Sequence, residues 1–245
     1  MSAQYDAIAR EYQATKESPL RQYVEAFSFF SMLGDVQGKE VLDLACGEGF
    51  YTRLIAGAGA CRVVGVDVSA AMVGLAEELE SQQSLGIEYH CADVATMPDF
   101  GHFDVVTAAY LLHYATDCNS LQSMCDRIAA RLQPGGRFVC INENPDQLFA
   151  DFSGYTQYGF NKSAAGTQQD GAKLTYAMVS GRQMIRFDVF YYARATYEAA
   201  LYQAGFSEVH WVPLQLDPLG VEAHGAAYFQ EYMGNPPVTG LVCVL

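Results

Sequence analysis

The chain has 245 residues, of which 51% are apolar and 17% are charged, and its formal net charge is −14. These proportions are typical of a folded globular protein, and no apolar run reaches the roughly 20 residues that a membrane-spanning helix needs. The acidic charge argues against nucleic-acid and membrane partners, because both carry negative charge. We therefore expect a small-molecule ligand. The polar start MSAQYDAIAREYQ is unlike a secretory signal, so we expect a cytoplasmic protein, either a monomer or a homodimer.

The cysteine and histidine positions give no sign of a disulfide framework or a metal site. The seven cysteines are scattered without a C-x-x-C pair, at positions 46, 61, 91, 118, 125, 140 and 243. Several lie within apolar runs, such as RFVCI and LVCVL, where a buried reduced thiol is the simplest interpretation. The histidines show no metal-ligand spacing with each other or with cysteine. We predict free thiols and no bound metal.

The first 33 residues are predicted to be helical and to form a cap. Aromatic and aliphatic side chains recur at three- and four-residue spacings there, and Pro19 is expected to begin a second helix. From Lys39 onward, short β-rich runs alternate with amphipathic stretches of helical length. The runs are KEVLDLA, CRVVGVDV, IEYHCAD, FDVVTAAY and GRFVCIN. This alternation over residues 36–144 predicts βαβ units, and so an α/β fold with a mostly parallel sheet and helices on both faces.

After Asn144 the pattern loosens, which favours a lid or insertion over residues 145–195. KLTYAMV and QMIRFDVFYY flank Ser180-Gly181 and predict a small antiparallel hairpin. Thr196 is expected to cap a last helix that stops at Gly205, and FSEVHWVPL and TGLVCVL are expected to be closing strands over the remainder of 196–245. No linker divides the sequence, so we predict a single domain over 1–245.

The most informative stretch is KEVLDLACGEGFYTRLI. A strand is predicted to end at Leu44 or Ala45, glycines follow at 47 and 49, and a helix begins near Phe50. Glycines let the backbone turn sharply and approach a ligand, and the helix start directs free amide donors into the same space. A ligand site is therefore expected at the carboxyl ends of the parallel strands.

The acids around this loop indicate which ligand it binds. A dinucleotide fingerprint would have a third glycine where Thr52 stands, and an NAD-dependent oxidoreductase stays open only as an alternative. Asp43, at the strand end before the loop, suits a ligand that carries an ammonium and a sulfonium group. Asp67 ends the second strand and is well placed for ribose hydroxyls, and Asp93 ends the third, where it could accept from an adenine amino group.

Taken together, the series Asp43-x-x-x-Gly47-x-Gly49, Asp67, Asp93, FDVV at 103–106 and LQPGGR at 132–137 resembles the class I S-adenosylmethionine-dependent methyltransferases. The resemblance implies a Rossmann-like sheet of seven strands with one antiparallel strand near the edge, and S-adenosylmethionine as cofactor. It implies a set of cofactor contacts along the crevice: Tyr12, Asp43, Ala45, Gly47, Gly49, Asp67, Val68, Met72, Ala92, Asp93, Val94 and Ala108.

A second resemblance, to a narrower group of proteins, implies a class of substrate. YDAIAREY, GDVQGKEVLDLACGEGFYTRLI, ADVATM and TGLVCVL look like segments of the toxoflavin-forming azapteridine N-methyltransferases. This resemblance implies a flat, nitrogen-rich heterocycle of secondary metabolism as substrate, with oxygen as the other possible methyl acceptor.

Three residues are expected on the substrate side, and none is assigned with confidence as catalytic. Tyr5 lies in the N-terminal cap. His113 follows the fourth predicted strand and could take a substrate proton, although shaping the pocket or bonding the backbone is the favoured role. Glu143 ends the fifth strand, where it could orient a polar substrate or simply cap the strand. Methyl transfer by in-line displacement needs mainly alignment, so a non-catalytic cofactor-binding protein is the second alternative.

Overall fold

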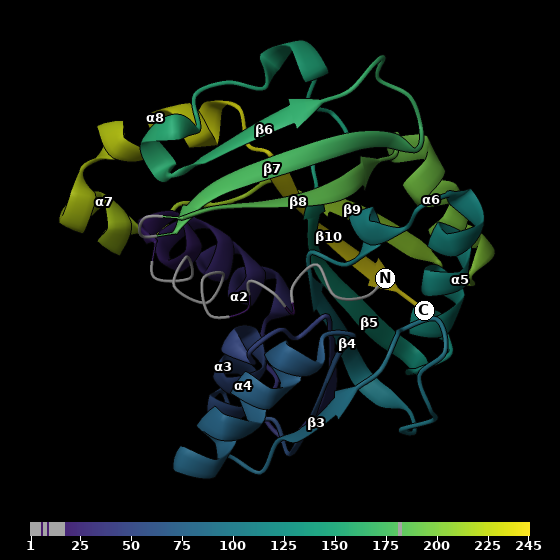
Figure 1. The fold of residues 1–245 in the computed structure, drawn as a ribbon. Coiled ribbons are helices and arrows are strands. Elements are labelled where there is room, and N and C mark those ends of the chain that lie inside the picture. Colours follow the sequence, from purple (N-terminus) through teal and green to yellow (C-terminus); the bar gives the residue numbers. More distant parts are fainter. Residues whose placement is uncertain (1–5, 7–8, 10–17, 181–182) are drawn as a thin grey trace.

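In the computed structural model, the described residues are 6, 9, 18–180 and 183–245. Their main feature is a seven-stranded sheet with the order β3-β2-β1-β4-β5-β10-β9 (Figure 1). Strands β1 to β5 are mutually parallel, and β10 runs antiparallel to both of its neighbours. The predicted Rossmann-like sheet with one antiparallel strand is confirmed. The strands are Glu40–Leu44 (β1), Arg62–Asp67 (β2), Glu88–Cys91 (β3), Phe103–Ala109 (β4), Leu132–Glu143 (β5), Glu208–Val212 (β9) and Val238–Val244 (β10).

Helices cover both faces because the central strands are apolar on both sides. Along β5, Phe138 and Cys140 face one core while Val139 and Ile141 face the other, and all four are fully buried. Helices α5 (Cys118–Ala129) and α6 (Arg194–Gln203) pack against the first core. The second core is covered by α2 (Phe27–Leu33), α3 (Phe50–Gly57) and α4 (Ala70–Gln82), and by α8 (Ala226–Gly234).

Above the large sheet lies a small antiparallel sheet of three strands (Figure 1). Strands β7 (Ala172–Ser180) and β8 (Gln183–Tyr191) form the predicted hairpin, and β6 (Phe160–Ala164) adds a third strand that the sequence did not predict. The inward positions of β6 include Lys162, which is only 5% exposed. A buried lysine interrupts the apolar alternation by which a half-buried strand is recognised.

Within the described residues, four short helical segments connect these layers. A π-helix, η2 (Arg21–Ala26), leads directly into α2, and single 3₁₀ turns occur at η3 (Leu112–Tyr114), η4 (Phe149–Asp151) and η5 (Thr156–Tyr158). The helix that contains η2 begins at Pro19, as the sequence predicts. π-Helical turns are rare and often lie at functional sites.

The structure corrects three further expectations. Helices α7 (Pro218–His224) and α8 lie between β9 and β10, where only strands were predicted. Thr196 lies inside α6, which begins at Arg194 without a side-chain cap, while Gly205 ends the helix with φ +108° as expected. All seven cysteines are free, but Cys61, Cys91 and Cys118 are exposed rather than buried. Within the described part of the chain, no helix is both long and apolar enough to cross a bilayer.

Candidate functional site

The strand order reverses between β1 and β4, and ligands in open α/β sheets bind at the carboxyl ends of the strands beside such a switch point. The loop after β1 has an unusual backbone there. Ala45, Gly47 and Gly49 have φ of +53°, +57° and +86°. At Gly49 a Cβ atom would lie 2.3 Å from the hydroxyl oxygen of Tyr89, whereas at Gly47 it would meet no atom of the described residues within 4 Å. The loop therefore needs glycine at 49 for its conformation and its packing, and it is open beside 47.

Asp67 links this loop to the neighbouring strand ends. Its Oδ2 accepts a hydrogen bond from the amide of Gly47 at 2.8 Å, and its Oδ1 accepts one from Ser69 at 2.8 Å. Its main-chain carbonyl accepts a hydrogen bond from the amide of Ala92 at 2.9 Å. The glycine loop, the end of β2 and the segment after β3 thus meet at one residue.

Asp43 is more deeply buried than we expect of a residue that contacts a cofactor. The carboxylate is 2% exposed, and it accepts hydrogen bonds from the hydroxyls of Thr52 (2.6 Å) and Thr107 (2.8 Å). Asp43 therefore joins β1 to α3 and β4. Its contact with a cofactor stays a prediction.

The other predicted cofactor residues divide between the strand ends and the cores. Asp93 lies two residues beyond β3, and its Oδ1 accepts from the amide of Ala95 at 2.9 Å, which fixes a tight turn. Ala92 is partly buried and Val68 is exposed. The side chains of Val94, Met72 and Ala108 are buried in apolar clusters.

The loop also holds an acid that the sequence reasoning missed. Glu48 lies between the two glycines and is 3% exposed, and its Oε2 has no hydrogen-bond partner among the described residues. A buried carboxylate oxygen without a donor is costly unless a ligand supplies one. Together with the open side of Gly47, it fits a ligand with an ammonium group. No group of three or more His, Cys, Asp and Glu side chains in the described residues could hold a metal ion.

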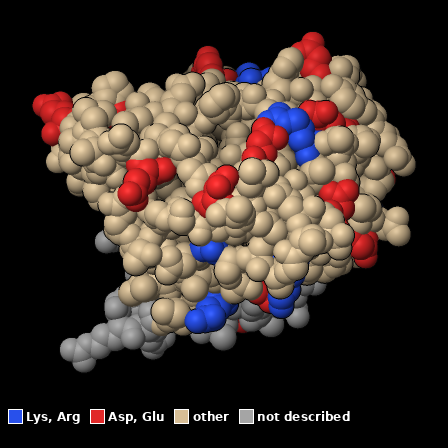
Figure 2. Space-filling model, turned by 90° about the horizontal axis from the view of Figure 1, so that it is seen from above, with Lys and Arg blue, Asp and Glu red and all other residues tan. Residues whose placement is uncertain are grey.

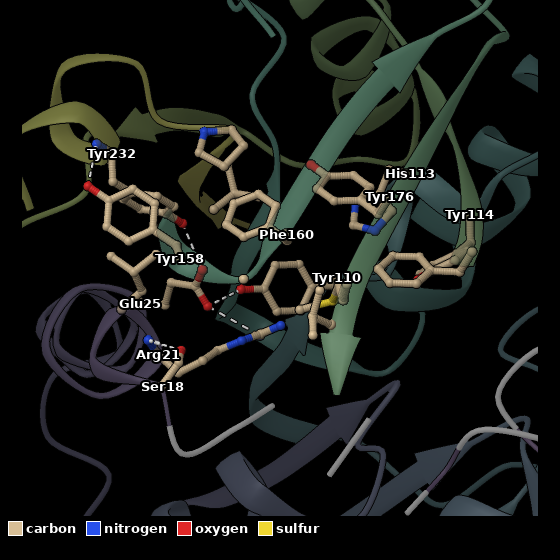
Figure 3. A pocket seen from close by; sticks show the side chains of 17 residues that line it. Ser18, Arg21, Glu25, Tyr110, His113, Tyr114, Tyr158, Phe160, Tyr176 and Tyr232 are labelled. Carbon is tan, nitrogen blue, oxygen red and sulfur yellow. Dashed lines mark hydrogen bonds and ion pairs between the residues drawn. The ribbon is translucent and has the colours of Figure 1, made fainter. Parts of the chain in front are cut away.

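A cavity of about 260 Å³ lies between the main sheet, the π-helix η2, α8 and the small sheet (Figure 3). Tyr110, which directly follows β4, and His113 of η3 form part of its wall. Four aromatic side chains of the insertion also line it: Tyr158, Phe160, Tyr176 and Phe187. The rings of Tyr176 and Phe187 are stacked at 5.4 Å with an angle of 5° between their planes. The insertion therefore supplies a flat apolar wall beside the end of β4.

At the opposite wall, three polar side chains converge on Glu25, and the four residues come from three distant segments (Figure 3). Tyr232 of α8 donates a hydrogen bond to Glu25 Oε1 at 2.7 Å, and Tyr110 donates to Oε2. The guanidinium of Arg21 lies 3.2 Å from Oε2 and 4.6 Å from the centre of the Tyr110 ring. Tyr110 has φ +70°, which is strained for a bulky residue. We infer that these contacts hold Tyr110 in place.

His113 is 3% exposed, and burial lowers its pKa to about 3. Its main-chain amide donates to Asn142 Oδ1 at 3.2 Å, and its Nδ1 lies 3.1 Å from the same oxygen. The ring is therefore neutral at physiological pH and lines the cavity, and its part in the reaction stays a prediction.

Glu143 is 1% exposed and forms an ion pair with Lys162, whose side chain is fully buried. Its Oε2 accepts a hydrogen bond from Tyr176 at 2.8 Å. Burial raises the pKa of Glu143 and lowers that of Lys162. Glu143 is absent from the cavity lining and reaches it only through Tyr176, so its direct substrate contact stays a prediction.

Tyr5 and Tyr12 lie outside the described residues, so their predicted contacts stay predictions. Besides Glu48, the site residues that the sequence analysis missed are Arg21, Glu25, Tyr110 and Tyr232, all of which line the cavity. Only one signal could have found any of them, namely a charge pair four residues apart on an otherwise apolar helix.

Comparisons with known proteins agree with this geometry. Residues 41–136 match the family model for a methyltransferase domain. The chain is 36% identical over 135 residues to the ubiquinone biosynthesis O-methyltransferase of Coxiella burnetii, covering 54% of this chain and 56% of that protein. It is 27% identical over 183 residues to the N-demethylindolmycin N-methyltransferase of Streptomyces griseus, covering 73% and 75%.

The chain thus spans little more than half the length of the first of these relatives. Among solved structures, an S-adenosylmethionine-dependent methyltransferase from Mesorhizobium loti superposes with a TM-score of 0.67 at 20% identity, over 94% of this chain and all of that one. Residues 41–136 are thus similar to methyltransferase domains, and the fold of the chain is shared with a solved methyltransferase.

Proposed function

We propose that this protein transfers a methyl group from S-adenosylmethionine to a small molecule, with nitrogen of a planar, azapteridine-like heterocycle as the preferred acceptor and oxygen as the other possibility. The observation that carries the proposal is the aromatic cavity beside the end of β4, at the edge of the sheet where Gly47 and Asp67 lie. The named relatives include both an O- and an N-methyltransferase, and the N-methyltransferase matches the longer share of the chain.

The chain's own residues would bind and orient the reactants. The cofactor supplies an electrophilic methyl group on a sulfonium. Asp67 and Asp93 would hold its ribose and adenine, and the buried oxygen of Glu48 would accept from its ammonium group. The aromatic wall excludes water and fixes the plane of the substrate, which favours in-line attack.

The insertion over 145–195 would then act as the substrate lid, above the cofactor-binding core of 36–144. The face seen in Figure 2 supports a small substrate, because acidic and basic side chains are scattered over it instead of forming one basic surface. A nucleic-acid substrate would need such a surface.

Two measurements test the proposal. Calorimetry with S-adenosylhomocysteine and with NAD should show binding of the first only, and binding of NAD alone would refute the cofactor assignment. Incubation with radiolabelled S-adenosylmethionine and a panel of N-heterocycles and phenols should then yield labelled product. Cofactor binding without transfer to any member would favour a non-catalytic binding protein.

A further inference from the structure

Four tyrosine hydroxyls of the cavity donate their hydrogen bonds to groups of the protein. The hydroxyls of Tyr110 and Tyr232 both donate to Glu25, and that of Tyr176 donates to Glu143. The hydroxyl of Tyr158 donates to the carbonyl of Tyr228 at 2.6 Å. Burial raises the pKa of Tyr110, Tyr176 and Tyr232, so these phenols stay protonated. Each of these four hydroxyls thus donates its one proton within the protein, and that of Tyr158 also accepts from the amide of Tyr232 at 3.2 Å. Toward a ligand the four hydroxyls can act only as acceptors.

The charges of the cavity are balanced. Arg21 is the one cationic side chain among the described residues that line it, and it is paired with Glu25. His113 is neutral, and the buried Lys162 behind the wall is paired with Glu143. Among the described lining residues, an anionic ligand would therefore meet acceptor oxygens and the Glu25 carboxylate, and the only cation would be one already paired with that carboxylate.

Glu25 still has room to accept from a ligand. An ionised carboxylate offers about four acceptor positions. Tyr232 occupies one on Oε1, and Tyr110 and Arg21 lie at Oε2. One position on Oε1 remains, and Glu25 lines the cavity beside the residue that follows β4.

Resting on the proposed function, which makes this cavity the substrate site, we propose that it selects uncharged planar aromatic compounds by their N–H groups, with Glu25 as the acceptor. Glu25 accepts a hydrogen bond from an N–H group at the edge of the ring system. The tyrosine hydroxyls, which can only accept from a ligand, favour further N–H groups. The stacked pair of Tyr176 and Phe187 packs against the ring system.

A series of ligands of nearly equal size tests this preference by calorimetry, with and without S-adenosylhomocysteine. Benzimidazole carries an N–H group, 1-methylbenzimidazole and benzoxazole do not, and benzimidazole-5-carboxylate carries both the N–H and a negative charge. We expect benzimidazole to bind at least about tenfold more tightly than each of the other three, because a hydrogen bond to a charged group is lost or an anion is buried.

Glu25→Gln should reduce the difference between benzimidazole and its 1-methyl derivative to less than about threefold. Glu231→Gln is the matched control, because Glu231 is an exposed acid on α8, next to Tyr232 but outside the cavity lining, and it should leave the difference unchanged. The ligand series on the wild-type protein tests the preference for N–H groups even if the Glu25 variant does not fold.

Equal affinities for the N–H and N-methyl compounds, tightest binding of the carboxylate, or no binding by any member would overturn the inference. Labelled methyl transfer without an N–H preference would refute the inference and leave the proposed function standing. A preference for N–H compounds without any methyl transfer would support the inference and refute the proposed function.

Discussion

The buried ion pair between Lys162 and Glu143 gives the sharpest test of how the small sheet is held on the main sheet. The ammonium of Lys162 also donates to Gln147 Oε1 at 2.7 Å and lies 4.1 Å from the centre of the Phe152 ring. Lys162→Met removes the cation and leaves the Glu143 carboxylate buried with the hydroxyl of Tyr176 as a donor. Breaking one partner of a buried pair costs about 3–5 kcal/mol, so we expect a loss of that size in the free energy of unfolding.

The control is Lys173→Met in β7 of the same sheet. Lys173 pairs with Asp188 at 2.6 Å, but the two side chains are 53% and 40% exposed. Solvent screens such a pair, so the loss should be below about 1 kcal/mol. Urea denaturation measures both variants, with the change in midpoint at constant slope giving the change in stability.

The pH dependence of Lys162→Met has a definite sign. Burial already raises the pKa of Glu143 beside Lys162, and without the cation this pKa rises further. An acid whose folded pKa is raised stabilises the fold below its unfolded pKa and loses that contribution as pH rises. The deficit should therefore be largest near pH 8 and shrink toward pH 5. A loss no larger than that of Lys173→Met, or a deficit that grows in acid, would refute the reasoning.

Three other substitutions test the site and its loop. His113→Gln should remove a pH dependence of stability, because the folded pKa of His113, about 3, lies below the ordinary 6.5. Between pH 7 and pH 5 the wild-type protein should lose about 2 kcal/mol more free energy of unfolding than the variant, as measured by urea midpoints. Asp67→Ala should weaken S-adenosylhomocysteine at least about tenfold in calorimetry, and unchanged affinity would contradict the ribose contact. Gly49→Ala should lower thermal stability more than Gly135→Ala. Both glycines have positive φ (+86° and +76°), but only at Gly49 would the added Cβ clash, with Tyr89. Equal losses of thermal stability would contradict the packing role of Gly49.

The half of the fold that contains the glycine loop follows from local signals in the sequence. Strand β1 ends at Leu44 and α3 begins at Phe50, as the sequence predicts, because an apolar run and two glycines each act over a few residues. Asp67 ends β2, again as predicted. Parallel strands bring such positions to one edge of the sheet, so their order along the chain is enough to place them together.

The cavity and the small sheet could not be predicted in this way, because their contacts join distant segments. Glu25 is 85 residues from Tyr110 and 207 residues from Tyr232, and no local pattern encodes those pairings. Strand β6 was missed because Lys162 occupies an inward position whose partner, Glu143, belongs to a different sheet. Tertiary pairing of polar side chains overrode the apolar alternation on which strand prediction depends.

The left-handed backbone of Tyr110 has a consequence for anyone who wishes to make this protein more robust. Replacing a strained residue by glycine or asparagine is a standard way to raise a melting temperature. At this position the exchange would relieve backbone energy of about 1–3 kcal/mol and also delete the phenol that reaches Glu25. Backbone strain and a buried hydrogen bond are thus opposed at a single residue, so glycine there would trade one contribution to stability for another and would remove a wall of the cavity.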